Sequence, residues 1–504
     1  MSQDVIDQLR ANLRDHQDDR GIEFEGRWVS WGEVARYGDA VVALLDAAGC
    51  PPSAKVGIII RNRLAHAAAV VGLLAHRRSV SFVYPFLPAT AISDNIESLG
   101  AAAILADQQD WPNFAQAAAD AGCVGISFGG IDDAPNLVDG LEKCKRSSFD
   151  DALPDGGIEV LSSGTTGTPK RIPMPLKLLE RAVMSAPGAE SGSAPPVQIN
   201  IWPLGGVGGV CLLTGAAVNN TPLVLMERFT VDGLVDALRR HRPDTLGLNP
   251  TAIAMIMDAN VSPEDMVSVK SVSGGSAYLD PDLQERFEAR YDLPILWGMG
   301  ATEFCGTIVR WTPQMRAERG DSKRGSTGLP MPGVEIRAID PESGVEVPCG
   351  AEGLLEVHCP SVRPDWVRTT DLVMIDEDGY VFHRGRHDGA IVRGGFKILP
   401  ERVVDVLRQH PAVVDASVVG IPDARLGAVP VAAVELSRSA GAVDEQALLA
   451  HVRAELPPTH VPVEIRIVDA LPRTPSLKVS LTEIKKMFWL TLPEWRARQG
   501  EWGG

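Results

Sequence analysis

A run of hydroxyl residues and glycines follows directly after the apolar, β-type stretch at residues 158–160. It consists of Ser162, Ser163, Gly164, Thr165, Thr166, Gly167, Thr168, Pro169 and Lys170. Backbone N–H groups and hydroxyls can surround a phosphate, and the lysine adds a mobile positive charge. A Walker loop has glycine before its lysine and Ser or Thr after it, whereas Pro169 precedes Lys170 and Arg171 follows. The sequence therefore predicts a phosphate loop of another kind, with a polar surface loop as the alternative.

Further segments rich in glycine and polar residues follow this loop. In order, they are residues 202–209 (Trp-Pro-Leu-Gly-Gly-Val-Gly-Gly), 274–277 (Gly-Gly-Ser-Ala), 300–303 (Gly-Ala-Thr-Glu), 366–371 (Trp-Val-Arg-Thr-Thr-Asp), 385–388 (Gly-Arg-His-Asp), 394–398 (Gly-Gly-Phe-Lys-Ile) and 472–478 (Pro-Arg-Thr-Pro-Ser-Leu-Lys). Each segment is weak alone, but their order is specific. Together with residues 161–170 they resemble the signatures of the adenylate-forming superfamily of acyl-CoA synthetases, peptide-synthetase adenylation domains and beetle luciferases. The resemblance extends from about residue 20 to about residue 485 and is closest to the acyl-CoA ligases.

The resemblance implies a reaction in two steps. A carboxylate attacks the α-phosphate of ATP, pyrophosphate leaves, and the resulting acyl-AMP reacts with the thiol of CoA and releases AMP. Negative charge gathers around one phosphorus atom, so catalysis depends mainly on positioning and charge neutralisation. ATP, Mg²⁺ and CoA as a co-substrate are therefore expected, with a bulky hydrophobic carboxylic acid as the substrate.

The resemblance also assigns roles to individual residues. Lys478, Glu303 and Thr166 are the expected catalytic residues: Lys478 would supply charge to the α-phosphate, and Glu303 would hold Mg²⁺, which typically uses one or two carboxylates. Asp371 would accept hydrogen bonds from the ribose hydroxyls. Taken singly, Lys478 would be interpreted as a surface lysine and Asp371 as a turn residue. The expected nucleotide-binding residues are Ser162, Ser163, Gly164, Thr165, Thr166, Gly167, Thr168, Lys170, Gly274, Gly275, Ser276, Gly298, Met299, Gly300, Ala301, Thr302, Asp371, Arg386 and Lys478.

The acid would occupy a pocket formed by one segment and one later residue. Its expected residues are Trp202, Leu204, Gly205, Gly206, Val207, Gly208 and Asn249. The family usually has an aromatic residue and then His where this chain has Gly205 and Gly206, so we expect either a wider pocket or a space filled by a neighbour such as Trp202 or Met299.

A hinge at Asp388 would exchange Lys478 for a thiol-transfer loop of Arg393, Gly394, Gly395 and Phe396. Other departures from the family pattern lie close to these motifs. Met299 stands where an aromatic residue is expected near adenine, Val392 replaces a common lysine, and Thr370 and Leu477 each replace a glycine. The thiol-transfer step is therefore less firmly predicted than adenylation.

Composition excludes several classes of protein. The chain has 504 residues, of which 45% are hydrophobic and 22% charged, which argues against a disordered or fibrous protein. A net charge of −17 argues against a nucleic-acid partner. The seven cysteines are dispersed without CxxC spacing, which is typical of reduced thiols. The charged N-terminus does not resemble a signal peptide and no membrane span is evident, so a cytoplasmic location is expected.

Hydrophobic patterning indicates how these motifs are carried. Residues 20–150 alternate β-rich runs such as 56–60 with helical windows such as 64–76, which predicts βαβ units and a parallel sheet in one α/β body that extends to about residue 310. Short strand-like runs follow and then an α+β region. The predicted fold is α/β, with a large N-terminal domain (1–387) that includes a β-rich subdomain at about 325–384, and a small mobile C-terminal α+β domain (388–504).

Other functions remain open at this point. The acyl group could pass to the phosphopantetheine thiol of an acyl carrier protein instead of CoA, and a luciferase-like oxygenation is a further option. A non-catalytic acyl- or nucleotide-binding protein is the alternative from another class. A nicotinamide site and a zinc site are disfavoured, because residues 298–303 end in Glu instead of the third fingerprint glycine and no HExxH pattern occurs.

Overall fold

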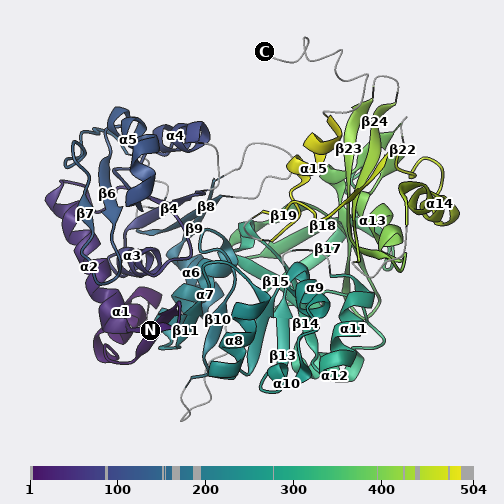
Figure 1. Ribbon diagram of the computed structural model, residues 1–504, viewed down its shortest axis with the longest axis horizontal. Coiled ribbons are helices and arrows are strands. Elements are labelled where there is room, and N and C mark those ends of the chain that lie inside the picture. Colours follow the sequence, from purple (N-terminus) through teal and green to yellow (C-terminus); the bar gives the residue numbers. More distant parts are fainter. Residues whose placement is uncertain are drawn as a thin grey trace.

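The computed structural model describes residues 4–85, 89–149, 153, 155–161, 171–184, 195–275, 277, 279–393, 396–423, 426–437, 443–474 and 477–489. Two lobes stand on a broad base (Figure 1). The early α/β elements form one lobe, the middle of the chain forms the base, and the last elements form the second lobe.

The first lobe is built on a seven-stranded sheet in the order β7-β6-β5-β3-β4-β8-β9. Its strands are β3 (Val56–Ile59), β4 (Ser79–Val83), β5 (Ala103–Asp107), β6 (Val124–Phe128), β7 (Asn136–Leu137), β8 (Gly157–Leu161) and β9 (Arg171–Pro175). The pairs from β6 to β8 are parallel, and only the edge strands β7 and β9 run antiparallel. The predicted parallel sheet is therefore present.

Helices cover both faces of this sheet. On one face lie α2 (Trp31–Ala47) and α3 (Leu64–Ala75), and on the other lie α4 (Ala89–Ser98) and α5 (Trp111–Asp120). Every residue of α3 is buried, as expected for a helix that is apolar all round. The helices α2 and α3 touch at two glycines, since a Cβ on Gly38 would lie 2.5 Å from the Cα of Gly72.

The sequence predicted one α/β body that extends to about residue 310. Instead, the base has two sheets of its own, separate from the sheet of the first lobe. One four-stranded sheet has the order β10-β11-β1-β2, and one five-stranded sheet has the order β12-β13-β14-β15-β16. Their strands are β1 (Arg20–Phe24), β2 (Arg27–Ser30), β10 (Gln198–Asn200), β11 (Leu223–Leu225), β12 (Thr245–Leu248), β13 (Ser271–Gly274), β14 (Ile295–Ala301), β15 (Gly306–Arg310) and β16 (Leu329–Pro330). The cause is long-range pairing, because β1 pairs in parallel with β11, about 200 residues later in the chain.

Helices surround these sheets and join them to the first lobe. They are α1 (Val5–Asp15), α6 (Leu176–Met184), α7 (Val207–Val218), α8 (Val231–His241), α9 (Pro250–Asp258), α10 (Pro263–Met266), α11 (Pro281–Tyr291) and α12 (Pro313–Arg319). Three short 3₁₀ segments also occur in the described residues: η1 (Gln108–Asp110), η2 (Thr302–Phe304) and η3 (His387–Gly389).

Two sheets make up the rest of the chain. The antiparallel sheet of β17 (Glu335–Ile339), β18 (Glu352–Cys359), β19 (Arg363–Ile375) and β20 (Val381–Arg386) occupies the expected β-rich region. The last sheet contains β21 (Ile391–Arg393), β22 (Phe396–Ile398), β23 (Val413–Asp423), β24 (Gly427–Leu436) and β25 (Ile465–Val468). It packs with α13 (Pro400–Arg408), α14 (Glu445–Glu455) and α15 (Leu481–Trp489).

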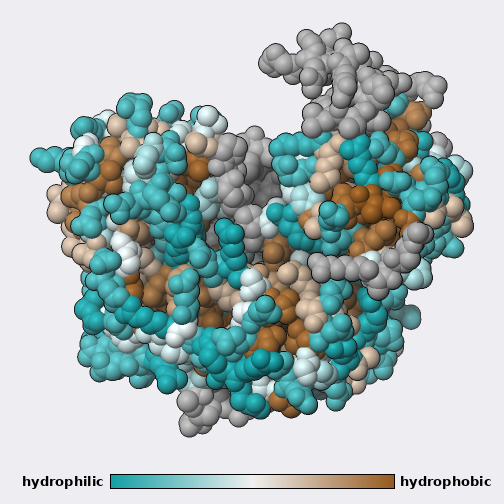
Figure 2. All heavy atoms as spheres, in the orientation of Figure 1, coloured by the Kyte–Doolittle hydropathy of each residue, from teal (hydrophilic) through white to brown (hydrophobic). Residues whose placement is uncertain are grey.

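The visible surface is mainly hydrophilic (Figure 2) and the cysteines are not paired, as the composition and the cysteine spacing predicted. The visible face is mainly hydrophilic, and apolar residues reach it only in patches (Figure 2). All seven cysteines are free thiols. Among the described residues, no helix combines the length and the apolar character that a bilayer crossing requires.

A buried ion pair lies beneath the hairpin of β8 and β9. The Nζ atom of Lys55 is 2.8 Å from Glu159 Oε2, and the two side chains are only 1% and 5% exposed. The Ser81 hydroxyl also donates to Glu159, at 3.0 Å. Arg171, the first residue of β9, donates to Ser81 Oγ and to Asn95 Oδ1 of α4, each at 2.8 Å. These bonds hold both strands that flank residues 162–170.

Removing one partner of this buried pair should destabilise the fold. We expect Glu159→Gln to lower the free energy of unfolding by about 3–5 kcal/mol, because Lys55 would remain buried without its counter-charge. The measurement is thermal or denaturant unfolding. Glu483→Gln is the matched control, because it breaks the exposed Lys486–Glu483 pair on α15, and it should cost less than about 1 kcal/mol. Equal losses of unfolding free energy in the two variants would contradict a stabilising role for the buried Lys55–Glu159 pair.

Candidate active site

The predicted adenine-binding motifs lie side by side at the carboxyl ends of two parallel strands. Gly274 ends β13 and pairs with Trp297 of β14. A Cβ on Gly274 would lie 2.2 Å from Leu248 O and from the Trp297 ring, and one on Gly275 would lie 2.8 Å from Gly298 O. Glycine is therefore required here by close approach of neighbouring atoms.

The Thr-Glu motif follows on the same strand. Gly298, Met299, Gly300 and Ala301 belong to β14, and Thr302 and Glu303 begin η2. A Cβ on Gly300 would lie 2.1 Å from Gly306 O. Glu303 is exposed, and no hydrogen bond or ion pair joins its side chain to a described residue. The Glu303 carboxylate is thus available to an external cation.

The ribose motif and the arginine motif meet across two antiparallel strands. Asp371 of β19 is the register partner of Arg386 of β20. The Arg386 guanidinium donates to Thr370 Oγ1 at 2.6 Å, so the threonine that replaces a family glycine holds this arginine. The Asp371 N–H donates to Thr369 Oγ1 at 3.1 Å. The register explains how two motifs 15 residues apart form one polar surface.

Sequence reasoning missed His383 as part of this surface. Its Nε2 lies 3.3 Å from Asp371 Oδ1. It comes from β20 and pairs with Val373, two residues beyond Asp371, past an irregularity in the register. The strand alternation places 383 and 371 on one face only once this register is known.

The C-terminal lysine segment contacts the base of the molecule. The Thr251 hydroxyl of α9 donates to Leu477 O at 2.9 Å, and Arg473 donates to Thr251 Oγ1 at 2.8 Å and to Asp415 Oδ2 at 2.7 Å. Leu477 has a φ of 61°, a left-handed conformation that is strained for this residue type. Its side chain packs against the apolar cluster of the base, which offsets this strain.

This contact brings Lys478 close to Arg386. Burial lowers the pKa of Lys478, and the charge of Arg386 lowers it further. No hydrogen bond or ion pair joins the Lys478 ammonium to another described residue. The charge of Lys478 thus lies near Arg386, which is itself the register partner of Asp371, and two neighbouring cations suit an anionic ligand.

The acid-pocket segment is fixed from behind by two asparagines. Asn62 Nδ2 donates to Trp202 O at 2.9 Å, and Leu204 N–H donates to Asn62 Oδ1 at 2.7 Å. Trp202 N–H donates to Asn200 Oδ1 at 2.8 Å. Val207 begins α7, and Gly206 is its N-cap residue.

The structure shows what surrounds three of the residues expected in this pocket. Leu204 is fully buried in the core of the first lobe. Asn249 caps α9, because its Oδ1 accepts the Ala252 N–H at 2.8 Å. Gly205 leaves no free space, since a Cβ there would lie 2.9 Å from both Ile60 and Tyr84. Core packing and helix capping hold these positions, and their role in an acid pocket stays a prediction.

The remaining predicted residues are described in part or not at all. Ser162, Ser163, Gly164, Thr165, Thr166, Gly167, Thr168, Lys170, Ser276, Gly394 and Gly395 lie outside the described residues. Asp388 lies in η3 and Phe396 in β22. Arg393 is bound within its own lobe, where it donates to Thr459 O at 2.8 Å and to Val461 O at 3.0 Å.

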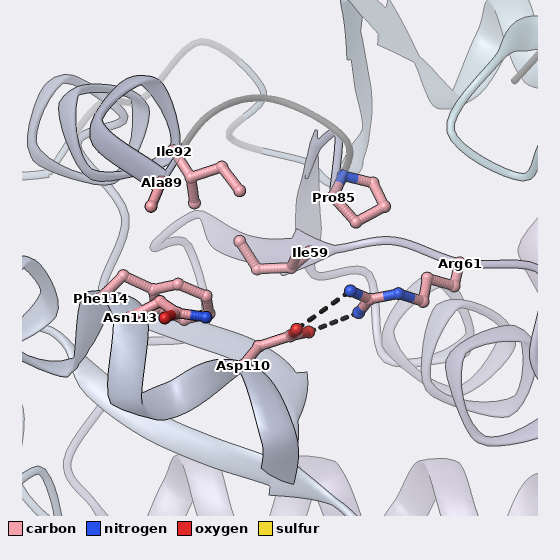
Figure 3. A pocket seen from close by; sticks show the side chains of 8 residues that line it. All are labelled: Ile59, Arg61, Pro85, Ala89, Ile92, Asp110, Asn113 and Phe114. Carbon is pink, nitrogen blue, oxygen red and sulfur yellow. Dashed lines mark hydrogen bonds and ion pairs between the residues drawn. The ribbon is translucent and has the colours of Figure 1, made fainter. Parts of the chain in front are cut away.

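A separate cavity lies in the first lobe, at the carboxyl ends of β3, β4 and β5 (Figure 3). Its volume is about 200 Å³, and its walls include Ile59, Arg61, Asp110 and Phe114. Arg61 donates to Asp110 Oδ1 at 3.0 Å across the cavity wall. None of the predicted site residues that the structure describes lines it.

Known proteins resemble this chain over nearly its whole length. The family described as AMP-binding enzyme matches residues 9–364, and the AMP-binding enzyme C-terminal domain matches residues 404–478. The chain belongs to the AMP-binding enzyme family. Membership of the adenylate-forming superfamily, the α/β fold and the enzyme class of AMP-forming acid–thiol ligases are confirmed as predicted.

Individual relatives show the same breadth of similarity. A 4-coumarate–CoA ligase-like protein 9 of Oryza sativa subsp. japonica is 26% identical, over 92% of this chain and 88% of its own. The fatty acid–[acyl-carrier-protein] ligase ScoC of Streptomyces coeruleorubidus is 26% identical over 92% of both chains. The crystal structure of ATP-bound MatB from Rhodopseudomonas palustris has a TM-score of 0.82 at 22% identity, covering 96% of this chain and 98% of its own, and shows the shared fold.

Two carboxylates belong to α13 of the last lobe, and one of them faces the end of β20 beside this site. Glu401 Oε2 faces Gly385, where a Cβ would be only 2.7 Å away, and Asp405 follows one turn later. Glu401 Oε2 and Asp405 Oδ1 are buried without a hydrogen-bond partner in the described part of the chain. Burial raises the pKa of Asp405 from 3.8 to about 6 against the pull of Arg408, and the charges of Asp280 and Glu401 add to the rise.

This raised pKa predicts a pH-dependent stability. The folded protein holds the Asp405 proton more tightly than the unfolded chain, so Asp405 lowers the free energy of unfolding as the pH rises from about 4 through about 6. Asp405→Asn should therefore raise the melting temperature at pH 7.5 and change it little at pH 4.5. Thermal unfolding across this pH range tests it, with exposed Glu377→Gln as the control. A change in melting temperature for Asp405→Asn that does not vary with pH would contradict the raised pKa of Asp405.

Proposed function

We propose that the chain is an ATP-dependent carboxylic acid–CoA ligase that forms an acyl-AMP, releases pyrophosphate and then passes the acyl group to a thiol with release of AMP. The observation that carries this proposal is the approach of Lys478 to Arg386 beside Asp371. Two cations and one carboxylate can bind a nucleoside monophosphate, because cations pair with its phosphate and a carboxylate accepts hydrogen bonds from its ribose hydroxyls.

In this proposal each residue has a defined task during adenylation. Lys478 neutralises charge on the α-phosphate and the acyl oxygen as the carboxylate attacks. Arg386 stabilises the same phosphate region, and Thr370 and the β19–β20 register fix its direction. Asp371 holds the ribose hydroxyls, and His383 restrains the Asp371 carboxylate. Gly274, Gly275 and Met299 receive the adenine ring.

A magnesium ion fits the Glu303 position. The Glu303 carboxylate is exposed and without a described partner, and Mg²⁺ commonly takes one or two carboxylates together with phosphate oxygens and water. When bound, the ion would neutralise charge on the ATP phosphates. Glu303 would hold and orient it.

The remaining expectations complete the proposal. Ser162 to Lys170, including Thr166, would bind phosphate, and Ser276 would contact adenine. The boundary between domains 1–387 and 388–504 would lie at Asp388, where rotation would bring Arg393, Gly394, Gly395 and Phe396 to the acyl-AMP. The base and the last lobe each have their own apolar core, which supports independent movement.

The acceptor thiol belongs to CoA in the main proposal and to an acyl carrier protein in the alternative. Relatives named for each acceptor match this chain over almost its full length. The alternative is retained for this reason. The acid is proposed to be bulky and hydrophobic.

Product analysis tests the proposal. The chain is incubated with ATP, Mg²⁺ and a panel of carboxylic acids, with CoA, with a phosphopantetheinylated carrier protein, or with neither, and products are identified by mass spectrometry. The proposal expects acyl-AMP without a thiol and acyl-CoA with CoA. Acyl transfer to the carrier protein alone would favour the alternative, and the absence of acyl-AMP from every acid would contradict both.

Loss of the lysine charge should impair adenylation selectively. We expect Lys478→Ala to reduce ATP–pyrophosphate exchange about 100- to 1,000-fold, as for the loss of one oxyanion donor. Lys486→Ala is the control, because Lys486 is exposed and, among the described residues, forms its ion pair with Glu483 on α15. If ATP–pyrophosphate exchange is unchanged in Lys478→Ala, or falls equally in the control, a specific role for Lys478 in adenylation is contradicted.

A further inference from the structure

The Thr251 hydroxyl joins two parts of the chain that are far apart in sequence. Thr251 is the second residue of α9, and the Asn249 side chain already caps this helix. The hydroxyl donates to Leu477 O at 2.9 Å and accepts a hydrogen bond from Arg473 at 2.8 Å. Both partners belong to residues 472–478, the lysine segment. Helix capping therefore does not explain the hydroxyl, and its hydrogen bonds go to the last lobe.

Arg473 connects this contact to the core of the last lobe. Its guanidinium donates to Asp415 Oδ2 at 2.7 Å, and Arg408 of α13 donates to Asp415 Oδ1 at 2.6 Å. Asp415 belongs to β23 and is buried. Hydrogen bonds between charged groups are strong and directional. The lysine segment is therefore held to the base at Thr251 and to the last lobe at Asp415.

The backbone around Lys478 forms a tight turn. The Thr474 N–H donates to Lys478 O at 2.7 Å, and the Leu477 N–H donates to Thr474 O at 2.8 Å. Arg473 and Val479 form an antiparallel bridge across the turn. These bonds fix the backbone of Lys478 relative to that of Leu477. Contacts that hold Leu477 on the base therefore also determine where Lys478 begins.

The Leu477 side chain provides the apolar part of this contact. The φ of Leu477 is 61°, a left-handed conformation that costs free energy for a residue with a Cβ and little for glycine. The side chain packs against the apolar cluster of the base. Because that cluster belongs to the base, this packing can offset the strain only while the lysine segment lies on the base.

We propose that Thr251 and Leu477 are positioning residues for adenylation, which dock the lysine segment on the base and so hold Lys478 at the nucleotide site. This inference rests on the proposed function. Thr251 belongs to the base and the lysine segment to the last lobe, so the proposed rotation at Asp388 would break both contacts. The contacts therefore stabilise the arrangement for adenylation and contribute nothing to thiol transfer.

The first test removes the Thr251 hydroxyl. Two half-reactions are measured with an acid that the wild-type protein adenylates: ATP–pyrophosphate exchange, and acyl transfer from supplied acyl-AMP to the acceptor thiol. We expect Thr251→Val to lower kcat/KM for exchange about three- to tenfold, as for the loss of a hydrogen bond, and to change transfer less than about twofold. Thr251→Ser keeps the hydroxyl and should restore exchange.

Thr245→Val is the matched control for this test. It makes the same substitution at an exposed position, the first residue of β12, six residues before Thr251. Both half-reactions should stay at the wild-type level. Melting temperatures of all variants identify any loss of folding, and the Leu477 variants test the same docking from the last lobe.

The second test separates the apolar contact of Leu477 from its strain. Leu477→Ala keeps the left-handed strain and loses most of the contact, so exchange should fall about three- to tenfold. Leu477→Gly loses the contact and also removes the strain, so exchange should fall less than in Leu477→Ala. A loss in Leu477→Gly that equals or exceeds the loss in Leu477→Ala would contradict the assigned role of Leu477.

The outcomes separate this inference from the proposed function. Unchanged exchange in Thr251→Val, equal losses in exchange and transfer, or no restoration by Thr251→Ser would overturn the docking role and leave the ligase proposal intact. A wild-type protein that makes no acyl-AMP from any acid would overturn the proposed function, and this inference with it.

Discussion

The positive charges of Lys478 and Arg386 lie near each other in this structure. Burial and the charge of Arg386 both disfavour the ammonium form of Lys478. An anion bound near Lys478 would offset this cost to its ammonium form. The β19–β20 register places Arg386 beside Asp371, and Thr370 fixes the guanidinium. In the proposed site, the phosphate of the nucleotide lies at these two cations and its ribose lies at Asp371.

The approach of the cations depends on contacts between distant parts of the chain. Thr251, at the start of α9, binds both Leu477 O and Arg473, and Arg473 continues to Asp415 of the last sheet. Leu477 keeps a left-handed conformation that its packing against the base makes tolerable. Nearby, Glu401 and Asp405 bring buried carboxylates against the same boundary.

Much of the fold and the motif order could be predicted from the sequence, and pairwise geometry could not. Local patterning predicted β3 and α3 closely, because strand and helix periodicity is a local property. It did not predict that β1 pairs with β11. Asp371 and Arg386 were predicted singly, whereas His383 required a register with an irregularity. Likewise, no local signal indicated that Ile60 and Tyr84 fill the space at Gly205.

Comparing the affinities of AMP and adenosine by calorimetry would test the central claim most directly. The two ligands differ only in the phosphate, so their ratio isolates the contribution of the cations. The account predicts that the wild-type protein binds AMP at least about tenfold more tightly than adenosine, as charged hydrogen bonds allow. In Lys478→Met the preference should shrink while adenosine affinity stays the same. An AMP preference that is unchanged in Lys478→Met, or absent from the wild-type protein, would contradict the account.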